Sequence, residues 1–182
     1  MKKTEDSVKI LTWGLGIAVI LVIIFAVINS GKLVIKNSIS YKKNNIVHNT
    51  TSYSYYDDII HVGLNKLGIE ETVVIVQEVS TIPNSNFGDL ELKAVIRNSG
   101  NQYLILVNNL GRLEAIKVLS HELIHLKQYK SGRLIEKGGI ITFEGKEYYK
   151  NELPNYYARP WEKEAFMQQM DLREEIAKEI LE

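Results

Sequence analysis

The chain has no cysteine among its 182 residues and contains only four histidines. The lack of cysteine excludes disulfide bonds and every thiolate metal site, so any metal ion would need histidine and carboxylate ligands. The net charge is zero and the isoelectric point is near 6.9. Nothing in this charge balance indicates electrostatic binding to nucleic acid. The length suits one folded domain with an appendage.

A long run without charged residues lies near the N-terminus, from Ile10 to Ile28. A helix of about 19 residues crosses nearly all of a ~30 Å hydrocarbon core, and Trp13 lies where an interfacial anchor is expected. Residues 25–30 offer no good cleavage site for a signal peptide, and the run has no polar face that would suit a soluble core helix. We therefore expect residues 1–29 to form an N-terminal tail and an uncleaved, single-pass transmembrane anchor. Lysines flank the run about equally, so the side of the membrane is not specified.

The rest of the chain is expected to comprise a polar tether over residues 30–50 and a domain over residues 51–182. Helical spacing of apolar residues, β-branched runs and turn signals predict an α+β domain with a small mixed sheet. Pro160 is expected at the first position of the C-terminal helix. The predicted elements are helices over 53–67, 110–129 and 160–181, a hairpin of strands at 92–96 and 103–107, and further strands at 72–76, 134–135, 140–143 and 147–149.

The most informative stretch is H-E-x-x-H, which lies in the predicted helix over residues 110–129. His121 and His125 are four residues apart, so both imidazoles leave the same helix face and can share one Zn²⁺. Glu122 lies one position further round the helix, close to such a metal but poorly placed to bind it. The remaining positions from 119 to 126 are mostly apolar, so the helix is expected to be buried. The alternative is a buried helix with two satisfied core histidines.

A catalytic zinc usually has three protein ligands and one water, so a third ligand is needed. The start of the last predicted helix offers Glu162 and Glu164. At ~100° per residue, Glu162 projects nearer the apolar stripe of this helix than Glu164 does. A carboxylate beside a buried face needs a partner, and a metal supplies one. Helical phase therefore favours Glu162. The alternative is a first-turn carboxylate stabilised by the helix dipole. The apolar stripe consists of Trp161, Ala165, Leu172, Ile176 and Ile180.

With these residues in place, the chain resembles the gluzincin branch of the zincin metallopeptidases. In that branch, H-E-x-x-H is followed on a later helix by a Glu and, three residues on, a small residue, as in Glu162-x-x-Ala165 here. Residues 144–148 and 156–162 more narrowly resemble small zinc metallopeptidases of bacteria and phages. The resemblance covers about residues 110–165 and implies a zincin-like fold. Phe166 departs from the pattern, because many gluzincins have an Asp there that supports a ligand histidine, so this support must come from elsewhere.

The resemblance also implies a mechanism, that of a membrane-anchored zinc peptidase acting on peptides or proteins. Zinc held by His121, His125 and Glu162 would polarise a water and the scissile carbonyl. Glu122 would take the proton from the water and pass it to the leaving amine. Tyr156 or Tyr157 would stabilise the oxyanion, or would serve only as packing residues. Two alternative functions stay open: a catalytically silent, membrane-tethered zinc-binding module, and a zinc amidase that acts on cell-wall peptides.

Overall fold

The computed structural model describes residues 44–82, 92–100 and 102–182. The expected anchor from Ile10 to Ile28 and most of the tether lie outside the described residues. Among the helices that are described, none combines the length and the apolar character that crossing a membrane requires.

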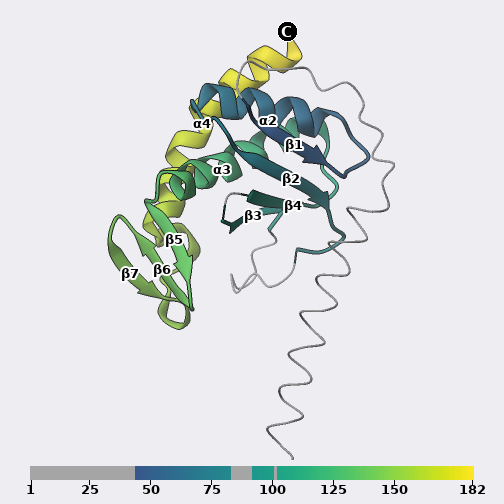
Figure 1. The fold of residues 1–182 in the computed structure, drawn as a ribbon. Helices are drawn as coiled ribbons and strands as arrows, with labels where there is room; N and C mark the ends of the chain where they lie inside the picture. Colours follow the sequence, from purple (N-terminus) through teal and green to yellow (C-terminus); the bar gives the residue numbers. More distant parts are fainter. Residues whose placement is uncertain (1–43, 83–91, 101) are drawn as a thin grey trace, which may run out of the picture. The chain divides into compact units, whose positions relative to one another are not determined.

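The described residues form a mixed α+β fold, as the sequence pattern predicts (Figure 1). The C-terminal helix begins at the predicted proline, whose fixed φ suits the first helical position. The strands are β1 (Ile46–Asn49), β2 (Val73–Glu78), β3 (Ala94–Ser99), β4 (Gln102–Val107), β5 (Leu134–Lys137), β6 (Ile140–Phe143) and β7 (Lys146–Tyr149). The helices are α2 (Tyr55–Lys66), α3 (Arg112–Lys130) and α4 (Pro160–Leu181), with short 3₁₀ turns η1 (Lys150–Glu152) and η2 (Tyr156–Ala158).

The larger sheet has the strand order β1-β2-β4-β3. Strands β1, β2 and β4 are parallel, whereas β3 runs antiparallel to β4 and forms the predicted hairpin with it. The turn of this hairpin includes Gly100 at φ +70°, a conformation that glycine adopts without strain. Strand β3 is therefore an edge strand, and one side of its backbone is not paired within the sheet.

Strand β1 lies in the stretch that we expected to belong to the tether. Its four residues pair in parallel with β2, from Ile46 opposite Val73 to Asn49 opposite Val76. None of the four side chains is buried. The sequence signal is weak because a short, exposed edge strand shows no apolar alternation and depends on the ladder of its neighbour. The folded domain thus begins earlier than residue 51.

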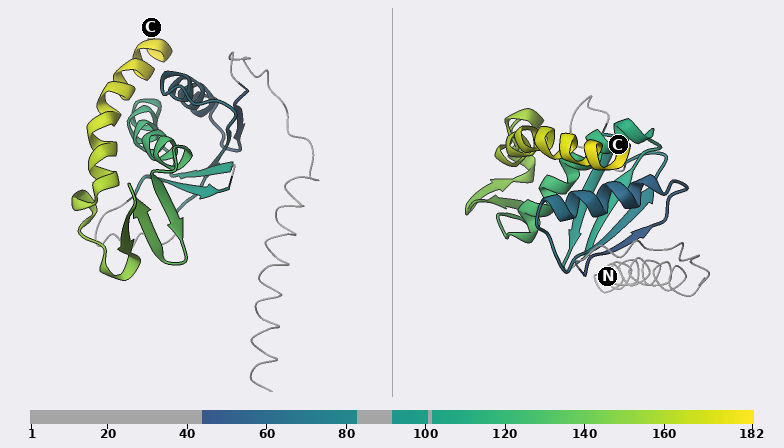
Figure 2. Two further views of the ribbon diagram at one scale, coloured as in Figure 1. Left: turned by 60° about the vertical axis from the view of Figure 1, so that its left-hand side comes forward. Right: turned by 90° about the horizontal axis from the view of Figure 1, so that it is seen from above.

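Helices α2 and α3 pack on one face of this sheet, and α4 packs against these two helices (Figure 2). Alternate strand residues such as Val74, Val76 and Ile105 are buried against them. Helices α2 and α3 approach closely at Gly63, where an added Cβ would lie 2.4 Å from Leu123 Cδ1. This approach holds α3 deep in the core, with a continuous buried face along most of its length.

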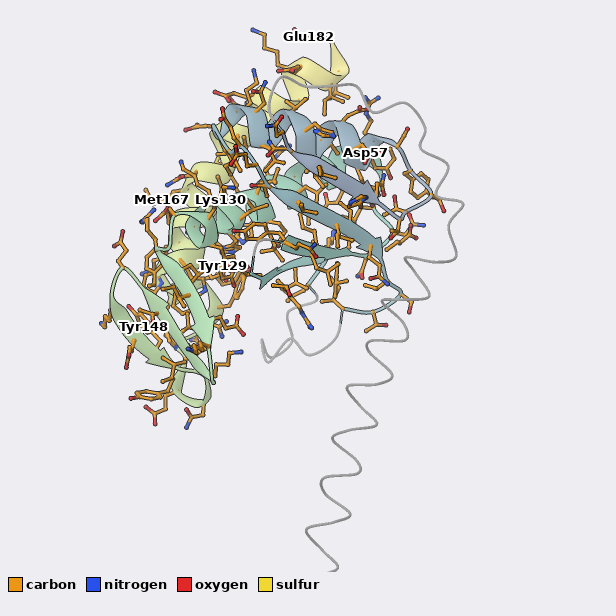
Figure 3. All side chains as sticks on the ribbon, viewed as in Figure 1. Asp57, Tyr129, Lys130, Tyr148, Met167 and Glu182 are labelled. Atoms are coloured by element: carbon orange, nitrogen blue, oxygen red, sulfur yellow. The ribbon has the colours of Figure 1, made fainter. Side chains whose placement is uncertain are left out.

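A smaller antiparallel sheet, β5-β6-β7, follows α3. Both of its hairpins have two-residue turns in which both residues have positive φ, Gly138–Gly139 and Glu144–Gly145, as type I′ turns require. Its buried side chains Leu134, Ile141 and Phe143 pack with Trp161 from α4 into a second cluster. Tyr129, near the end of α3, packs against both clusters (Figure 3).

Candidate metal centre

Helices α3 and α4 bring His121, His125 and Glu162 together in the protein interior. Their exposed fractions are 7 %, 6 % and 6 %. The Nε2 atoms of the two histidines lie 3.1 Å apart, and each lies 3.1 Å from Glu162 Oε2. The three ligating atoms thus form a nearly equilateral triangle. Among the residues that the structure describes, this is the group of histidine and acidic side chains arranged to hold a metal ion.

The dimensions of this triangle fit a small divalent cation. Ligand atoms about 2.0–2.1 Å from a tetrahedral zinc lie roughly 3.3 Å from one another. The observed separations of 3.1 Å are close to that value. A cation equidistant from the three atoms would have a fourth position, left for a water or a substrate. The donor set of two imidazoles and one carboxylate suits zinc among the common metals, and the geometry alone does not identify the ion.

Hydrogen bonds on the far side of each imidazole direct a lone pair into the triangle. His125 Nδ1 lies 2.8 Å from Gln128 Oε1, and His121 Nδ1 lies 3.1 Å from Gln169 Oε1. An amide oxygen only accepts, so each Nδ1 carries a proton, and in the neutral imidazole each Nε2 presents a lone pair. Two lone pairs and a carboxylate oxygen facing one another at 3.1 Å repel unless a positive charge lies among them. The arrangement could therefore hold a cation.

The electrostatics of the cluster point the same way. Burial raises the pKa of Glu162, but the adjacent imidazoles of His121 and His125, when they carry a proton on Nε2, outweigh it and hold the pKa well below its usual range. Burial lowers the pKa of His125, yet the adjacent Glu162 carboxylate raises it to about 9. The cluster thus favours a positive charge in its centre, which a proton supplies when no metal ion does.

Glu122 lies beside the triad and does not join it. The residue is 7 % exposed, and its Oε2 accepts a hydrogen bond from the Ile96 backbone N–H at 2.9 Å. Burial raises the pKa of Glu122, which brings it toward the range of a general base. The contact places the carboxylate next to the edge strand β3, where a substrate would have access.

The two tyrosines of η2 differ in their surroundings. Tyr156 Oη lies 3.4 Å from His121 Nε2, and burial raises the pKa of its hydroxyl, so the group stays a proton donor. Tyr157 is 59 % exposed, and its ring packs against Phe166. Tyr156 is therefore the tyrosine that faces the triad.

Glu164 lies outside the triad, on the outer side of α4. Its carboxylate accepts hydrogen bonds from the Arg133 guanidinium at 2.8 and 2.6 Å, and Arg133 also binds Glu144. The three residues form an ion cluster that we call the rim. The side chain of Glu164 is 18 % exposed, against 7 % for Glu162. Helical phase thus correctly separates the two carboxylates, and their roles toward a metal stay a prediction.

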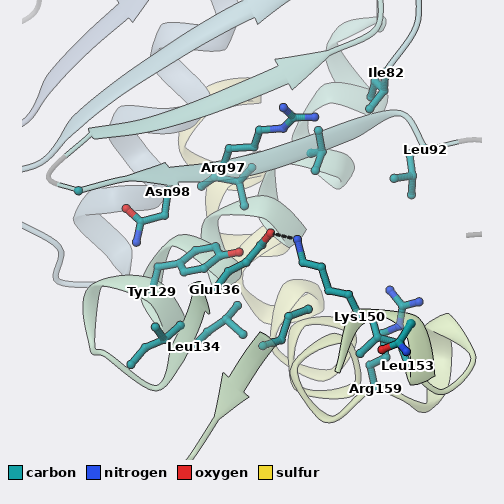
Figure 4. Close-up of a pocket in the computed structure, with 16 residues that line it drawn as sticks. Ile82, Leu92, Arg97, Asn98, Tyr129, Leu134, Glu136, Lys150, Leu153 and Arg159 are labelled. Carbon is teal, nitrogen blue, oxygen red and sulfur yellow. Dashed lines mark hydrogen bonds and ion pairs between the residues drawn. The ribbon is translucent and has the colours of Figure 1, made fainter. Parts of the chain in front are cut away.

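A cavity of about 120 Å³ lies over the site and is lined by Glu122, His125, Tyr156 and Glu162 together with residues of β3. It shares Ile96, Tyr129 and Arg159 with a larger cleft of about 1000 Å³. One wall of that cleft comes from β3 and the other from β5, β6 and η1 (Figure 4). Glu136 and Lys150 form an ion pair along the second wall. The candidate metal site is therefore reached through this cleft.

Three features of the site were not anticipated from the sequence. Gln128 lies three residues after His125, a spacing that places both on one helix face and would have predicted the contact. Gln169 lies seven residues after Glu162, two helical turns away on the same face. The bond between Glu122 and the Ile96 backbone joins residues 26 positions apart, and no local pattern indicates it.

In comparisons with protein families, curated proteins and solved structures, no family model, protein or structure matches the chain.

Proposed function

We propose that this protein is a zinc-dependent peptidase with a zincin-like domain of the gluzincin type. One observation carries the proposal: His121 Nε2, His125 Nε2 and Glu162 Oε2 converge at 3.1 Å, with Glu122 beside them at the floor of an open cleft. Zinc, when bound, supplies Lewis acidity, which polarises a carbonyl and makes water a nucleophile near neutral pH. The histidines and Glu162 would hold it, and the carboxylate would lower the charge of the centre.

Glu122 is the general base in this proposal. Its carboxylate lies beside the ligand histidines and is held by the Ile96 N–H, which leaves its other oxygen to accept a proton from the attacking water. The same carboxyl then passes the proton to the leaving amine. Tyr156, whose hydroxyl lies 3.4 Å from His121 Nε2, would donate a hydrogen bond to the oxyanion that develops on the scissile carbonyl.

An extended peptide is the substrate that best fits the cleft. Its near wall is β3, which has no strand on its outer side within the described part of the chain, and an edge strand binds an extended chain through backbone hydrogen bonds. The Ile96 N–H, which is bonded to Glu122, belongs to this edge. A peptide paired with β3 would therefore lie across the general base and the metal centre.

We also propose that Ile10 to Ile28 anchors the chain in a membrane, which carbonate extraction of the full-length protein tests.

The full-length chain with Glu122→Gln tests the mechanism. The variant keeps the hydrogen bond to Ile96 and the triad, so we expect about one equivalent of zinc, as in the wild type. Cleavage of a mixed-sequence peptide library, followed by mass spectrometry, should fall by roughly 10²–10⁴-fold. Activity near the wild-type level in the variant would contradict the role of Glu122.

The two alternatives give different outcomes in the same experiment. A catalytically silent binding module would bind zinc and leave the peptide library intact in both the wild type and the variant. A zinc amidase would leave the library intact and cleave the peptide stems of purified cell wall. A wild-type chain that binds no zinc would overturn the proposal as a whole.

A further inference from the structure

The position at which many gluzincins have an Asp is occupied by Phe166, which cannot accept a hydrogen bond. The Phe166 ring lies 4.7 Å from the His121 ring, centroid to centroid, at an interplanar angle of 51°. It restricts the imidazole by packing and leaves the choice of tautomer to other groups. A ligand histidine needs such a choice, because the nitrogen that binds a metal must be unprotonated.

Gln128 makes this choice for His125, and its own orientation is fixed. Its amide nitrogen donates to the Trp161 carbonyl at 3.0 Å. The nitrogen is therefore turned toward Trp161, so the amide oxygen is the atom that faces His125 Nδ1 at 2.8 Å. Gln128 is 1 % exposed, and water does not compete for these bonds.

Gln169 does the same for His121 from the opposite helix. Its Oε1 lies 3.1 Å from His121 Nδ1, and it is half-buried. The two glutamines thus act in a crossed manner. Gln128 on α3 bonds the backbone next to Glu162 on α4, and Gln169 on α4 bonds a histidine on α3. Both contacts fix the two helices against each other at the height of the triad.

We infer that Gln128 and Gln169 are positioning residues, which hold the Nε2 lone pairs of His125 and His121 on the metal in place of the missing carboxylate. This inference rests on the proposed function, because it concerns the same centre. Both acceptors are neutral amides and add no negative charge to the centre. Among the groups described above, the carboxylates near the metal are those of Glu162 and Glu122. Loss of an outer hydrogen-bond partner typically weakens metal binding about 10–100-fold.

The test uses the full-length chain and zinc affinity measured by competition with a chelator. We expect Gln128→Met and Gln169→Met each to weaken zinc binding about 10–100-fold, with the larger effect for the fully buried Gln128. Gln168→Met is the matched control, since Gln168 donates to Glu164 and should leave the affinity unchanged. Gln169→Glu restores an acceptor at a half-buried position and should recover the affinity.

A second readout separates positioning from a merely structural role. The chain has four histidines, so ¹⁵N-histidine labelling gives a simple spectrum of the zinc-loaded protein. We expect slowly exchanging Nδ1–H signals for His121 and His125 in the wild type. Gln169→Met should lose the His121 signal and keep the His125 signal. Should Gln128→Met fail to fold, Gln169→Met decides. Unchanged affinity and unchanged Nδ1–H signals in Gln169→Met would overturn the inference while zinc binding by the wild type stands. A wild type without zinc would overturn both.

Discussion

The segment at the start of α4 has an inner and an outer side, and the same residue types behave differently on them. On the inner side, Tyr156 and Glu162 face the histidines of α3. On the outer side, Tyr157 is largely exposed and Glu164 belongs to the rim. The pKa of both carboxyls is lowered, but for different reasons: the contact with two buried imidazoles for Glu162, and the Arg133 guanidinium for Glu164. A lowered pKa therefore does not by itself indicate a metal ligand. The chemistry of the group beside the carboxylate, imidazole or guanidinium, is the better indicator.

The largest expected effect on zinc affinity comes from replacing each of the two carboxylates with alanine, one at a time. Glu162→Ala removes one of three ligands, so zinc affinity should fall by more than the ~10–100-fold that an outer partner is worth, and peptide cleavage should disappear. Glu164→Ala should change zinc affinity by less than about threefold, because Arg133 rather than the metal is its partner. Chelator competition on both variants measures this. Loss of zinc from Glu164→Ala with retention by Glu162→Ala would reverse the comparison.

The sequence could predict the inner side because helical periodicity relates its residues to one another. His121 and His125 are one turn apart, and Glu162 flanks the apolar stripe that contains Trp161 and Ala165, so local spacing was sufficient. Apolar runs on either side of a glycine-containing turn likewise predict the strands of the β3–β4 hairpin and of the smaller sheet. Tyr156 and Tyr157, in contrast, precede the helix, and no periodicity applies to them. Which tyrosine faces the triad depends on the path of η2.

Long-range contacts between unlike elements account for what sequence reasoning missed. The polar composition before residue 51 predicts a tether, whereas β1 forms there by pairing with β2, which begins more than twenty residues later. The hydrogen bond from Ile96 to Glu122 follows from the packing of β3 against α3. The rim forms because the β6–β7 turn brings Glu144, and α4 brings Glu164, next to Arg133. None of these has a signature within one element.

An intermediate effect is expected for the two tyrosines. Tyr156→Phe keeps the ring packing and removes the hydroxyl that faces the triad, so kcat should fall about 10²-fold while zinc affinity stays unchanged. Tyr157→Phe should match the wild type in both measurements, since its side chain is mostly in solvent. Steady-state kinetics on the best library peptide provide the comparison. Equal kcat values for Tyr156→Phe and the wild type would leave Tyr156 a packing residue.

The smallest effect concerns the rim and its dependence on pH. The hydrogen bonds of Arg133 lower the pKa of Glu164 against the opposing effect of partial burial. A carboxyl whose pKa is lower in the folded state stabilises the fold fully above its unfolded pKa, near 4.5, and loses this contribution as the pH falls through the folded pKa. Because the pair is partly exposed, Glu164→Gln should reduce the free energy of unfolding by only ~0.2–1 kcal/mol at pH 7.

The difference between the wild type and Glu164→Gln should therefore shrink as the pH is lowered below about 4, and it should also shrink in high salt, which screens exposed charges. Urea unfolding followed by circular dichroism, with a chelator present so that zinc contributes nothing, measures it. Glu144→Gln is the matched control: Glu144 is 58 % exposed and shares the same arginine, so its effect should be smaller still. A difference that stays constant from pH 7 to the acid limit would show that Glu164 acts through packing or through Gln128, and that the outer side is coupled to the inner one.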